Sequence, residues 1–186
     1  MNELVRIICN RRSIRQYKTK QIADDDLVQI LDAAIAAPSA MNQQKWHFTV
    51  IQDKVMIDKM VAIIKENMIS SGNDLLATRA STPGYHTFHN APTVVLITAD
   101  EKARFVQIDC GTAAQNIALA AESLFLSSCI ITSSAFLFAS AKGEELKKKL
   151  GIPGGYIHIC SVALGYREGE KPVAPPRNEN VINYIK

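Results

Sequence analysis

Residues Phe105–Phe125 read FVQIDCGTAAQNIALAAESLF, and this stretch decides which folds the chain of 186 residues can adopt. Small or apolar side chains surround nearly the whole helical circumference, and the only acidic residues are Asp109 and Glu122. A helix that is apolar on every side is buried on most sides. A chain of this size has a limited core, so the stretch predicts a long helix that a second copy of the chain helps to cover.

Shorter helices and apolar strands flank this helix without a regular βαβ alternation. This pattern predicts a single α+β domain over residues 1–186, with a proline-rich C-terminal arm from about residue 166 to residue 186. Ser70–Asn90 is polar and is predicted to be a long mobile segment. We expect helices after the cap Asn2 and over Asp24–Ile35, Asp53–Met68 and Glu144–Leu150, a fully buried strand at Trp46–Gln52, and strands at Pro92–Thr98, Cys129–Thr132 and Ile157–Leu164.

Composition narrows the functional classes. Apolar residues make up 47% of the chain and the net charge is only +3, which is typical of a globular protein and argues against nucleic acid as the main partner. The N-terminus lacks the apolar core of a signal peptide, and no apolar run is long enough to cross a bilayer. The four cysteines form no C-x-x-C pair, so we expect four reduced, buried thiols in a cytoplasmic protein.

Several common catalytic motifs are missing. The chain has no G-x-G-x-x-G after a strand, no P-loop, no G-x-S-x-G and no H-E-x-x-H. His86 and His89 have helical spacing, but no third ligand lies nearby, so no metal site is expected. If a phosphate is bound, side chains must do much of the holding.

A basic cluster, Arg11-Arg12-Ser13-Ile14-Arg15, could hold such a phosphate. In an extended segment alternate side chains share a face, so Arg11, Ser13 and Arg15 could converge on one anion. Guanidinium groups pair bidentately with phosphate, and a hydroxyl adds a further donor. Taken alone, such a cluster more often forms a solvated basic turn.

A second polar segment runs from Pro38 to Trp46 and includes Ser39, Ala40 and Asn42. Pro38 ends the preceding helix, and the amide side chains that follow suit a flat heterocycle with donors and acceptors on one edge. Taken alone, the segment also reads as an ordinary helix stop and turn.

Together the two segments resemble the FMN-binding signature of the nitroreductase family. His89-Asn90-Ala91-Pro92-Thr93, Asp109-Cys110-Gly111-Thr112-Ala113 and Ala163-Leu164-Gly165-Tyr166 followed by Pro176-Arg177 resemble further family segments in the right order. The resemblance covers almost the whole chain. It implies a three-layer α/β/α sandwich with a mixed, mainly antiparallel sheet, and an intertwined homodimer with FMN at the interface.

The resemblance also implies roles for individual residues. Arg11, Ser13 and Arg177 would bind the FMN phosphate, and Arg12 and Arg15 would lie along the phosphate, the ribityl chain or the ring edge. Pro38, Ser39 and Ala40 would lie against the flavin, with Asn42 on its polar edge. The remaining implied cofactor contacts are Ile131, Thr132, Ser133 and Gly165. Independently, Tyr85, His86 and Phe88 lie in the long polar segment and are candidates to line a substrate lid.

The implied activity is hydride transfer from NAD(P)H through FMN to a nitroaromatic, quinone or similar small acceptor. One stretch departs from the family pattern, because Phe125, Ser127 and Thr132 stand where glycines are usual and Ile130 stands where a tryptophan is usual. We expect this stretch to take a different path, to reshape the pocket and to make common nitroaromatics poor acceptors. The departure leaves two alternatives open: other FMN chemistry, such as flavin fragmentation or reductive dehalogenation, and a non-catalytic flavin-binding protein.

Overall fold

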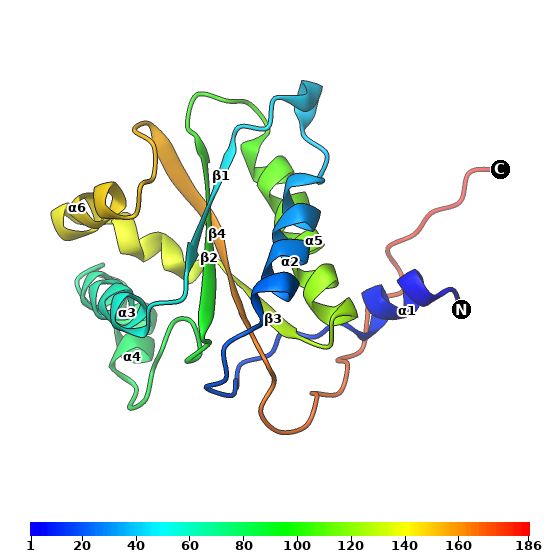
Figure 1. Cartoon of the computed structure of the whole chain (residues 1–186), viewed down its shortest axis with the longest axis horizontal. Helices are drawn as coiled ribbons and strands as arrows, with labels where there is room; N and C mark the ends of the chain where they lie inside the picture. The colour runs from blue at the N-terminus through cyan, green and yellow to red at the C-terminus, as the bar shows by residue number, and fades with distance from the viewer.

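One four-stranded sheet lies between two layers of helices in the computed structural model, which describes residues 1–186 (Figure 1). The strands lie in the order β1-β2-β4-β3, and every neighbouring pair is antiparallel. The α+β sandwich is therefore confirmed, whereas the mixed sheet is wrong: the one parallel contact is a single bridge between Ser13 and Ser128. The strands are β1 (Trp46–Ile51), β2 (Thr93–Asp100), β3 (Ser127–Ile131) and β4 (Tyr156–Gly165).

The two helical layers enclose two separate hydrophobic cores. On one face α2 (Asp24–Ile35) packs beside the long helix α5 (Val106–Ser123). On the other face lie α3 (Lys54–Ile69), α4 (Asp74–Ser81), the 3₁₀ helix η2 (Ser133–Phe138) and α6 (Ala141–Lys149). The 3₁₀ turn η1 (Ala40–Asn42) and α1 (Glu3–Asn10) lie outside these layers.

Local sequence explains where these helices begin. The side chains of Asn2 and Asp53 accept hydrogen bonds from the backbone N–H groups of Leu4 and Val55, which caps α1 and α3 as polar N-cap residues do. The aspartates at the start of α2 lie at the positive end of its helix dipole. These predicted helices are confirmed within one or two residues.

Three expectations about burial and order are wrong. Strand β1 is an edge strand whose residues are half-buried except for Ile51. The polar segment 70–90 contains α4, which Asn73 caps by accepting from two backbone N–H groups and which buries Ala80 in the core. Cys9 is exposed, although the other three cysteines are buried as expected. The sequence does not predict α4 within segment 70–90, because the apolar residues there are too few to give a helical period.

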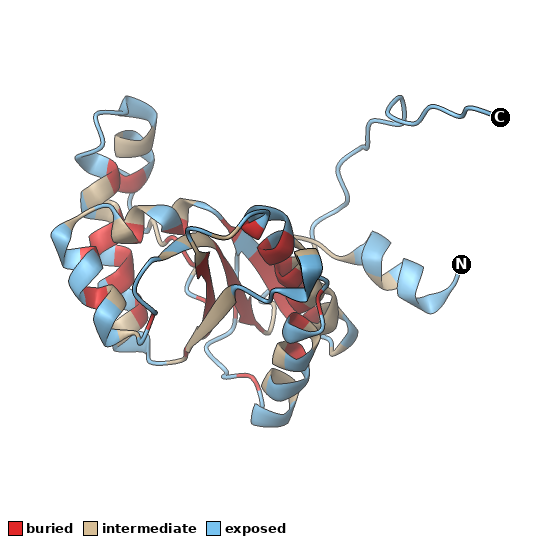
Figure 2. Ribbon diagram, turned by 90° about the horizontal axis from the view of Figure 1, so that it is seen from above, coloured by how far each residue is buried: buried red, intermediate tan, exposed pale blue.

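Large apolar side chains remain exposed on α1, at both ends of α5 and in the C-terminal arm. Helix α1 has no buried residue, and the C-terminal arm extends away from the body (Figure 2). Ile108 of α5 is 65% exposed and Phe125, just after α5, is 92% exposed. Apolar area of this kind marks an interaction surface. No helix has the length and apolar character that crossing a bilayer requires.

Candidate functional site

The basic cluster runs as an extended segment along the start of β3. The backbone N–H of Ile14 donates to the carbonyl oxygen of Ser128 at 3.0 Å, and Ile14 is buried in the core. Because side chains alternate along an extended segment, burial of Ile14 turns Ser13 and Arg15 to the opposite side. The predicted extended conformation is therefore confirmed.

The Cys129 thiol lies against this cluster. Burial raises the pKa of the thiol, and the positive charges of Arg15 and Arg11 and a hydrogen bond with Ser13 oppose that rise. The Cys129 thiol is therefore within hydrogen-bond reach of Ser13, and it lies close enough to Arg11 and Arg15 to be affected by their charges. Arg12 is engaged elsewhere: its guanidinium donates to the carbonyl oxygens of Cys9 and Arg11 at 2.8 and 2.7 Å, which satisfies backbone acceptors at the end of α1.

A second group of cations lies beyond Arg15. A cavity of about 350 Å³, here called the arginine cavity, contains no carboxylate. Neither Arg15 nor Arg79 forms an ion pair, and Arg79 stacks near the Tyr85 ring at 5.8 Å. Its lining residues are Arg15, Arg79, Thr82, Pro83, Gly84, Tyr85, His86, His89 and Asn90. A cavity with two unpaired guanidinium groups and no acid favours an anionic or electron-rich ligand.

Burial and nearby positive charges keep His89, one of the two histidines that line this cavity, neutral near pH 7. Burial lowers the pKa of His89 to about 4, and the positive charges of Arg15, His86 and Arg79 add to that effect. His89 and Asn90 both have a φ of 56°, in the left-handed region. His86 holds this turn, since its Nδ1 accepts from the backbone N–H groups of Phe88 and Asn90 at 3.2 and 3.1 Å.

A smaller cavity of about 210 Å³ shares Arg15 with the arginine cavity, and its lining includes Ser13 and Arg167 together with the carboxylates Glu168 and Glu170. Arg15 is the one residue that lines both cavities.

Loop 38–44 lies at the other end of α5. The backbone N–H of Ala40 donates to Asp109 at 3.1 Å, and the Thr112 hydroxyl donates to the carbonyl oxygen of Pro38 at 3.2 Å. Both contacts are in the first two turns of the helix. Ser13, by contrast, pairs with Ser128, beyond the helix C-terminus at Ser123.

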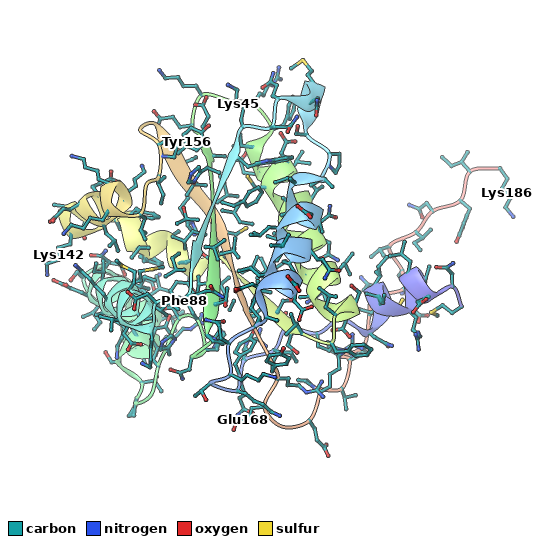
Figure 3. All side chains as sticks on the ribbon, in the orientation of Figure 1. Lys45, Phe88, Lys142, Tyr156, Glu168 and Lys186 are labelled. Carbon is teal, nitrogen blue, oxygen red and sulfur yellow. The ribbon has the colours of Figure 1, made fainter.

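The two halves of the site that the resemblance implies are therefore not brought together in one chain. An α-helix of 18 residues spans about 27 Å. Lys45, next to loop 38–44, and Glu168, whose backbone N–H donates to Gln16, lie at opposite ends of the molecule (Figure 3). A flavin whose phosphate and ring are joined by five carbons, about 10 Å of extended chain, does not reach from one to the other.

The other implied cofactor residues lie in different surroundings. Ile131 is buried, Thr132 is exposed and Ser133 is half-buried at the end of β3. Gly165 is in contact with the core, and a Cβ there would lie 2.7 Å from Pro92, so close packing accounts for the glycine. Arg177 is exposed in the C-terminal arm.

The three candidate lid residues contact the body of the protein in different ways. Phe88 is fully buried in the core, so its ring supports the segment and does not line open space (Figure 3). Tyr85 and His86 do line the arginine cavity. The Tyr85 hydroxyl donates to the Met68 sulfur at 3.3 Å, and His86 lies 3.7 Å from Asp58.

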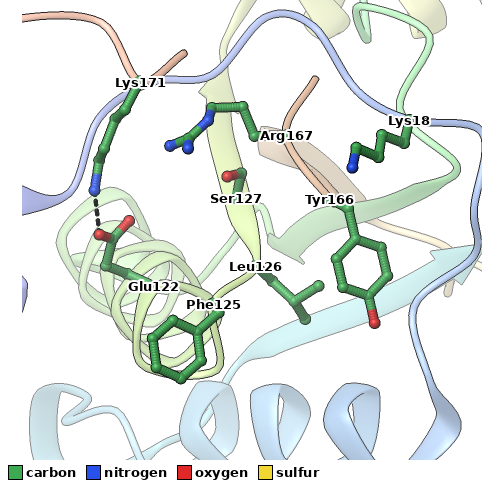
Figure 4. Close-up of a pocket in the computed structure, with 8 residues that line it drawn as sticks. All are labelled: Lys18, Glu122, Phe125, Leu126, Ser127, Tyr166, Arg167 and Lys171. Atoms are coloured by element: carbon green, nitrogen blue, oxygen red, sulfur yellow. Dashed lines mark hydrogen bonds and ion pairs between the residues drawn. The ribbon is translucent and has the colours of Figure 1, made fainter. Parts of the chain in front are cut away.

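The stretch that departs from the family pattern begins with a residue in the left-handed conformation. Phe125 has a φ of 59°, which glycine adopts without strain and a residue with a Cβ does not. Its ring lines a separate cavity of about 360 Å³ at the base of the arm, here called the arm cavity (Figure 4). Lys18 and Arg167 lie on the same cavity, and an ion pair between Lys171 and Glu122 fastens the base of the arm to α5.

Comparison with known proteins identifies the class of fold and site described above. Residues 8–166 match the model of the Nitroreductase family, and the chain belongs to that family of oxidoreductases. A protein of Archaeoglobus fulgidus is 36% identical over 180 residues, covering 92% of this chain and 89% of its own, and is provisionally named an NADH dehydrogenase/NAD(P)H nitroreductase.

Two solved structures share the fold over the full length of both chains. A nitroreductase with bound FMN from Bacteroides fragilis is 32% identical, with a TM-score of 0.95. A nitroreductase with bound FMN from Desulfitobacterium hafniense is 34% identical, with a TM-score of 0.93. The family expected from the sequence motifs is confirmed.

Sequence reasoning missed Arg79 and the contribution of His89. Arg79 lies in α4, within the segment that was read as a mobile loop. Had the segment been predicted as a helix, Arg79 would have stood on a fixed element. That placement is the signal that could have identified Arg79 as a candidate site residue.

Proposed function

We propose that the chain is an FMN-dependent oxidoreductase that transfers hydride from NAD(P)H to a small acceptor, working as a homodimer with two composite sites. The observation that carries the proposal is the arginine cavity. It has two unpaired guanidinium groups and no carboxylate in its lining, and Arg15 belongs both to this cavity and to the cluster that resembles the family's FMN signature. The relatives with bound FMN support the same cofactor for this chain.

Residues of this chain fit the parts of FMN. Arg11 and Ser13 would bind the phosphate through charge-assisted hydrogen bonds, with Arg177 joining when the arm is seated. Arg15, shared by both cavities, would lie along the middle of the cofactor. Arg79 and His89 would face the ring. FMN supplies the hydride-accepting ring nitrogen, so no nucleophilic side chain is required.

The arginine cavity favours electron transfer to whatever ring it holds. Fixed positive charges in a partly enclosed site favour negative charge on the ligand, and they need no rearrangement as that charge develops. Neutral His89 adds a ring that can stack or donate without a competing charge change near neutral pH.

A second subunit completes the site in this proposal. Loop 38–44 cannot reach the cluster of its own chain, so Pro38, Ser39, Ala40 and Asn42 would approach the cofactor held by the partner. The exposed apolar residues of α1, α5 and the arm supply the surface that such a dimer would bury. A largely apolar interface of more than about 2,000 Å² is expected for an obligate dimer.

The test is the visible absorption spectrum of the purified protein, followed by stopped-flow mixing with NADH and with NADPH. We expect a bound flavin that either nucleotide bleaches, followed by reoxidation by a panel of quinones, enones and nitroaromatics. Common nitroaromatics are expected to be poor acceptors compared with smaller or flatter oxidants, because pocket shape changes acceptor preference by about 1–3 kcal/mol per methylene-sized contact. A flavin that neither nucleotide bleaches would contradict the oxidoreductase proposal and favour a flavin-binding or flavin-fragmenting protein.

A further inference from the structure

Loop 38–44 has a backbone that its own sequence does not favour. Met41, Asn42 and Gln44 all have φ near 50°, in the left-handed region that side chains with a Cβ disfavour. Only asparagine of these three is common in that region. A loop with this strain keeps one conformation only where surrounding contacts fix it.

The contacts that fix this loop come from α5. Asp109 is only 7% exposed, lies in the first turn of the helix, and accepts the backbone N–H of Ala40 at 3.1 Å. One turn later the Thr112 hydroxyl, which has a single hydrogen to donate, lies 3.2 Å from the carbonyl oxygen of Pro38 and 2.7 Å from that of Asp109, so the two carbonyls share it. The helix thus binds one donor and one acceptor of the loop backbone.

Inside the loop, short-range hydrogen bonds complete the structure. The backbone N–H of Gln44 donates to the Ser39 hydroxyl oxygen at 3.0 Å, and that of Asn42 donates to the Ser39 carbonyl oxygen at 2.9 Å. The Gln44 amide donates to the Asn42 side chain at 3.0 Å. These bonds are exposed or local, so they shape the loop but do not attach it to the body.

We propose that Asp109 and Thr112 are positioning residues that hold loop 38–44 on α5 in the conformation that binds the partner subunit's flavin. The inference rests on the proposed function, because it assigns a use to the loop in a dimeric FMN site. Its physical basis is preorganisation: a loop already fixed before the cofactor arrives loses less conformational entropy on binding. Because the loop is attached to the helix that is expected to form the interface, association of the subunits would bring it to the cofactor in one step.

The experiment uses the full chain as the purified dimer. Asp109→Ala and Thr112→Val each remove one loop contact, whereas Asp109→Asn and Thr112→Ser keep an acceptor or a donor in place. The matched control is Asn116→Ala, which removes a bond from the same helix to the carbonyl oxygen of Ala33 in α2. Hydrogen–deuterium exchange of residues 38–44 is measured in the apoprotein, and FMN affinity by quenching of flavin fluorescence.

We expect Asp109→Ala and Thr112→Val to speed exchange in the loop and to weaken FMN binding about 5–30-fold. Asp109→Asn and Thr112→Ser should restore the affinity to within about threefold of the parent, and Asn116→Ala should leave loop exchange unchanged. Unchanged exchange in both loop variants would overturn the role of Asp109 and Thr112. Faster exchange with unchanged FMN affinity would instead show that the loop does not contact the cofactor, and the composite site would fail while FMN binding itself stood.

Discussion

Ser13 pairs with Ser128 in a single parallel bridge, and this contact places the basic cluster over the Cys129 thiol. Sheet hydrogen bonds thus fix the backbone of the cluster, while its charged side chains point away from the core. A binding site built in this way has its donors arranged before the ligand arrives, so removal of one donor is expected to affect affinity more than folding.

The first prediction concerns the phosphate. Arg11→Ala removes a charge-assisted pair and should weaken FMN binding about 10–150-fold, equivalent to roughly 1.5–3 kcal/mol. The affinity for riboflavin, which lacks the phosphate, should change little in the same variant. Arg12→Ala is the matched control, because the Arg12 guanidinium already donates to two backbone carbonyls. Titration of apoprotein gives both constants, and equal affinity of the parent for FMN and riboflavin would contradict phosphate recognition.

The second prediction concerns the arginine cavity. Arg79→Ala removes one of two unpaired cations, so the reduced, negatively charged form of a bound flavin should be stabilised less. The midpoint potential should become about 20–60 mV more negative. Spectroelectrochemistry of the bound flavin measures the shift. Lys142→Ala is a suitable control, since Lys142 pairs with Glu66 and lines a different cavity. An unchanged potential would place the ring outside this cavity.

The third prediction concerns the arm. A chain ending at Lys171 keeps the ion pair with Glu122 but loses Arg177 and the exposed apolar residues Val181, Ile182 and Ile185. Both subunit association and FMN affinity should fall. Sedimentation at micromolar concentration and a flavin titration test this together. A parent protein that sediments as a monomer with flavin bound would contradict the dimer, whatever the truncated chain does.

The sequence predicted the layers of this fold because helix caps and apolar periods are local signals. Asn2 caps its helix as expected, the helix predicted over Asp53–Met68 is present with Asp53 as its N-cap, and the long helix over 105–125 is present. Helix α4 was missed because it is short and polar and depends on Asn73 and the burial of Ala80. The edge position of β1 could not be predicted either, because strand order depends on pairing between distant segments.

The candidate site was predicted only in part, because local sequence motifs identify some of its residues while others come from distant segments. Arg15 was identified within its motif, but its neighbours Arg79 and His89 come from distant segments and share no sequence pattern with it. No local signal showed that Phe88 points into the core while Tyr85 lines the cavity.

The fourth prediction concerns acid stability. His158 lies among Ser134 and Ser161, with both hydroxyls 3.0 Å from Nε2, while its buried Nδ1 has no partner. Burial lowers the pKa of His158 to about 4, whereas an unfolded chain takes up this proton near the ordinary value of 6.5. The unfolded state therefore binds more protons between pH 6.5 and 4, and stability falls as the pH is lowered through that window.

This group should contribute up to about 2–3 kcal/mol to the loss of stability between pH 7 and pH 4. His158→Gln cannot titrate, so its unfolding free energy should fall by about 2–3 kcal/mol less over the same range, even if it is less stable at pH 7. Urea unfolding at several pH values gives the slope of the unfolding free energy against pH. Parallel slopes in the parent and the variant would show that His158 does not titrate in this window.

The last prediction concerns Phe125, where the family pattern has glycine. A left-handed conformation costs a residue with a Cβ about 1–2 kcal/mol, and part of this cost is absent for glycine. Phe125→Gly should therefore be more stable than Phe125→Ala by about 1 kcal/mol, since both remove the same exposed ring and only glycine relieves the backbone. Urea unfolding of the two variants gives this difference, and equal stability would show that the left-handed turn is not maintained. The ring itself is 92% exposed at the arm cavity, so its removal should cost little packing within one chain. If the ring packs against a second copy, both variants should weaken the dimer by the same factor, and sedimentation equilibrium separates that shared effect from the difference in backbone strain.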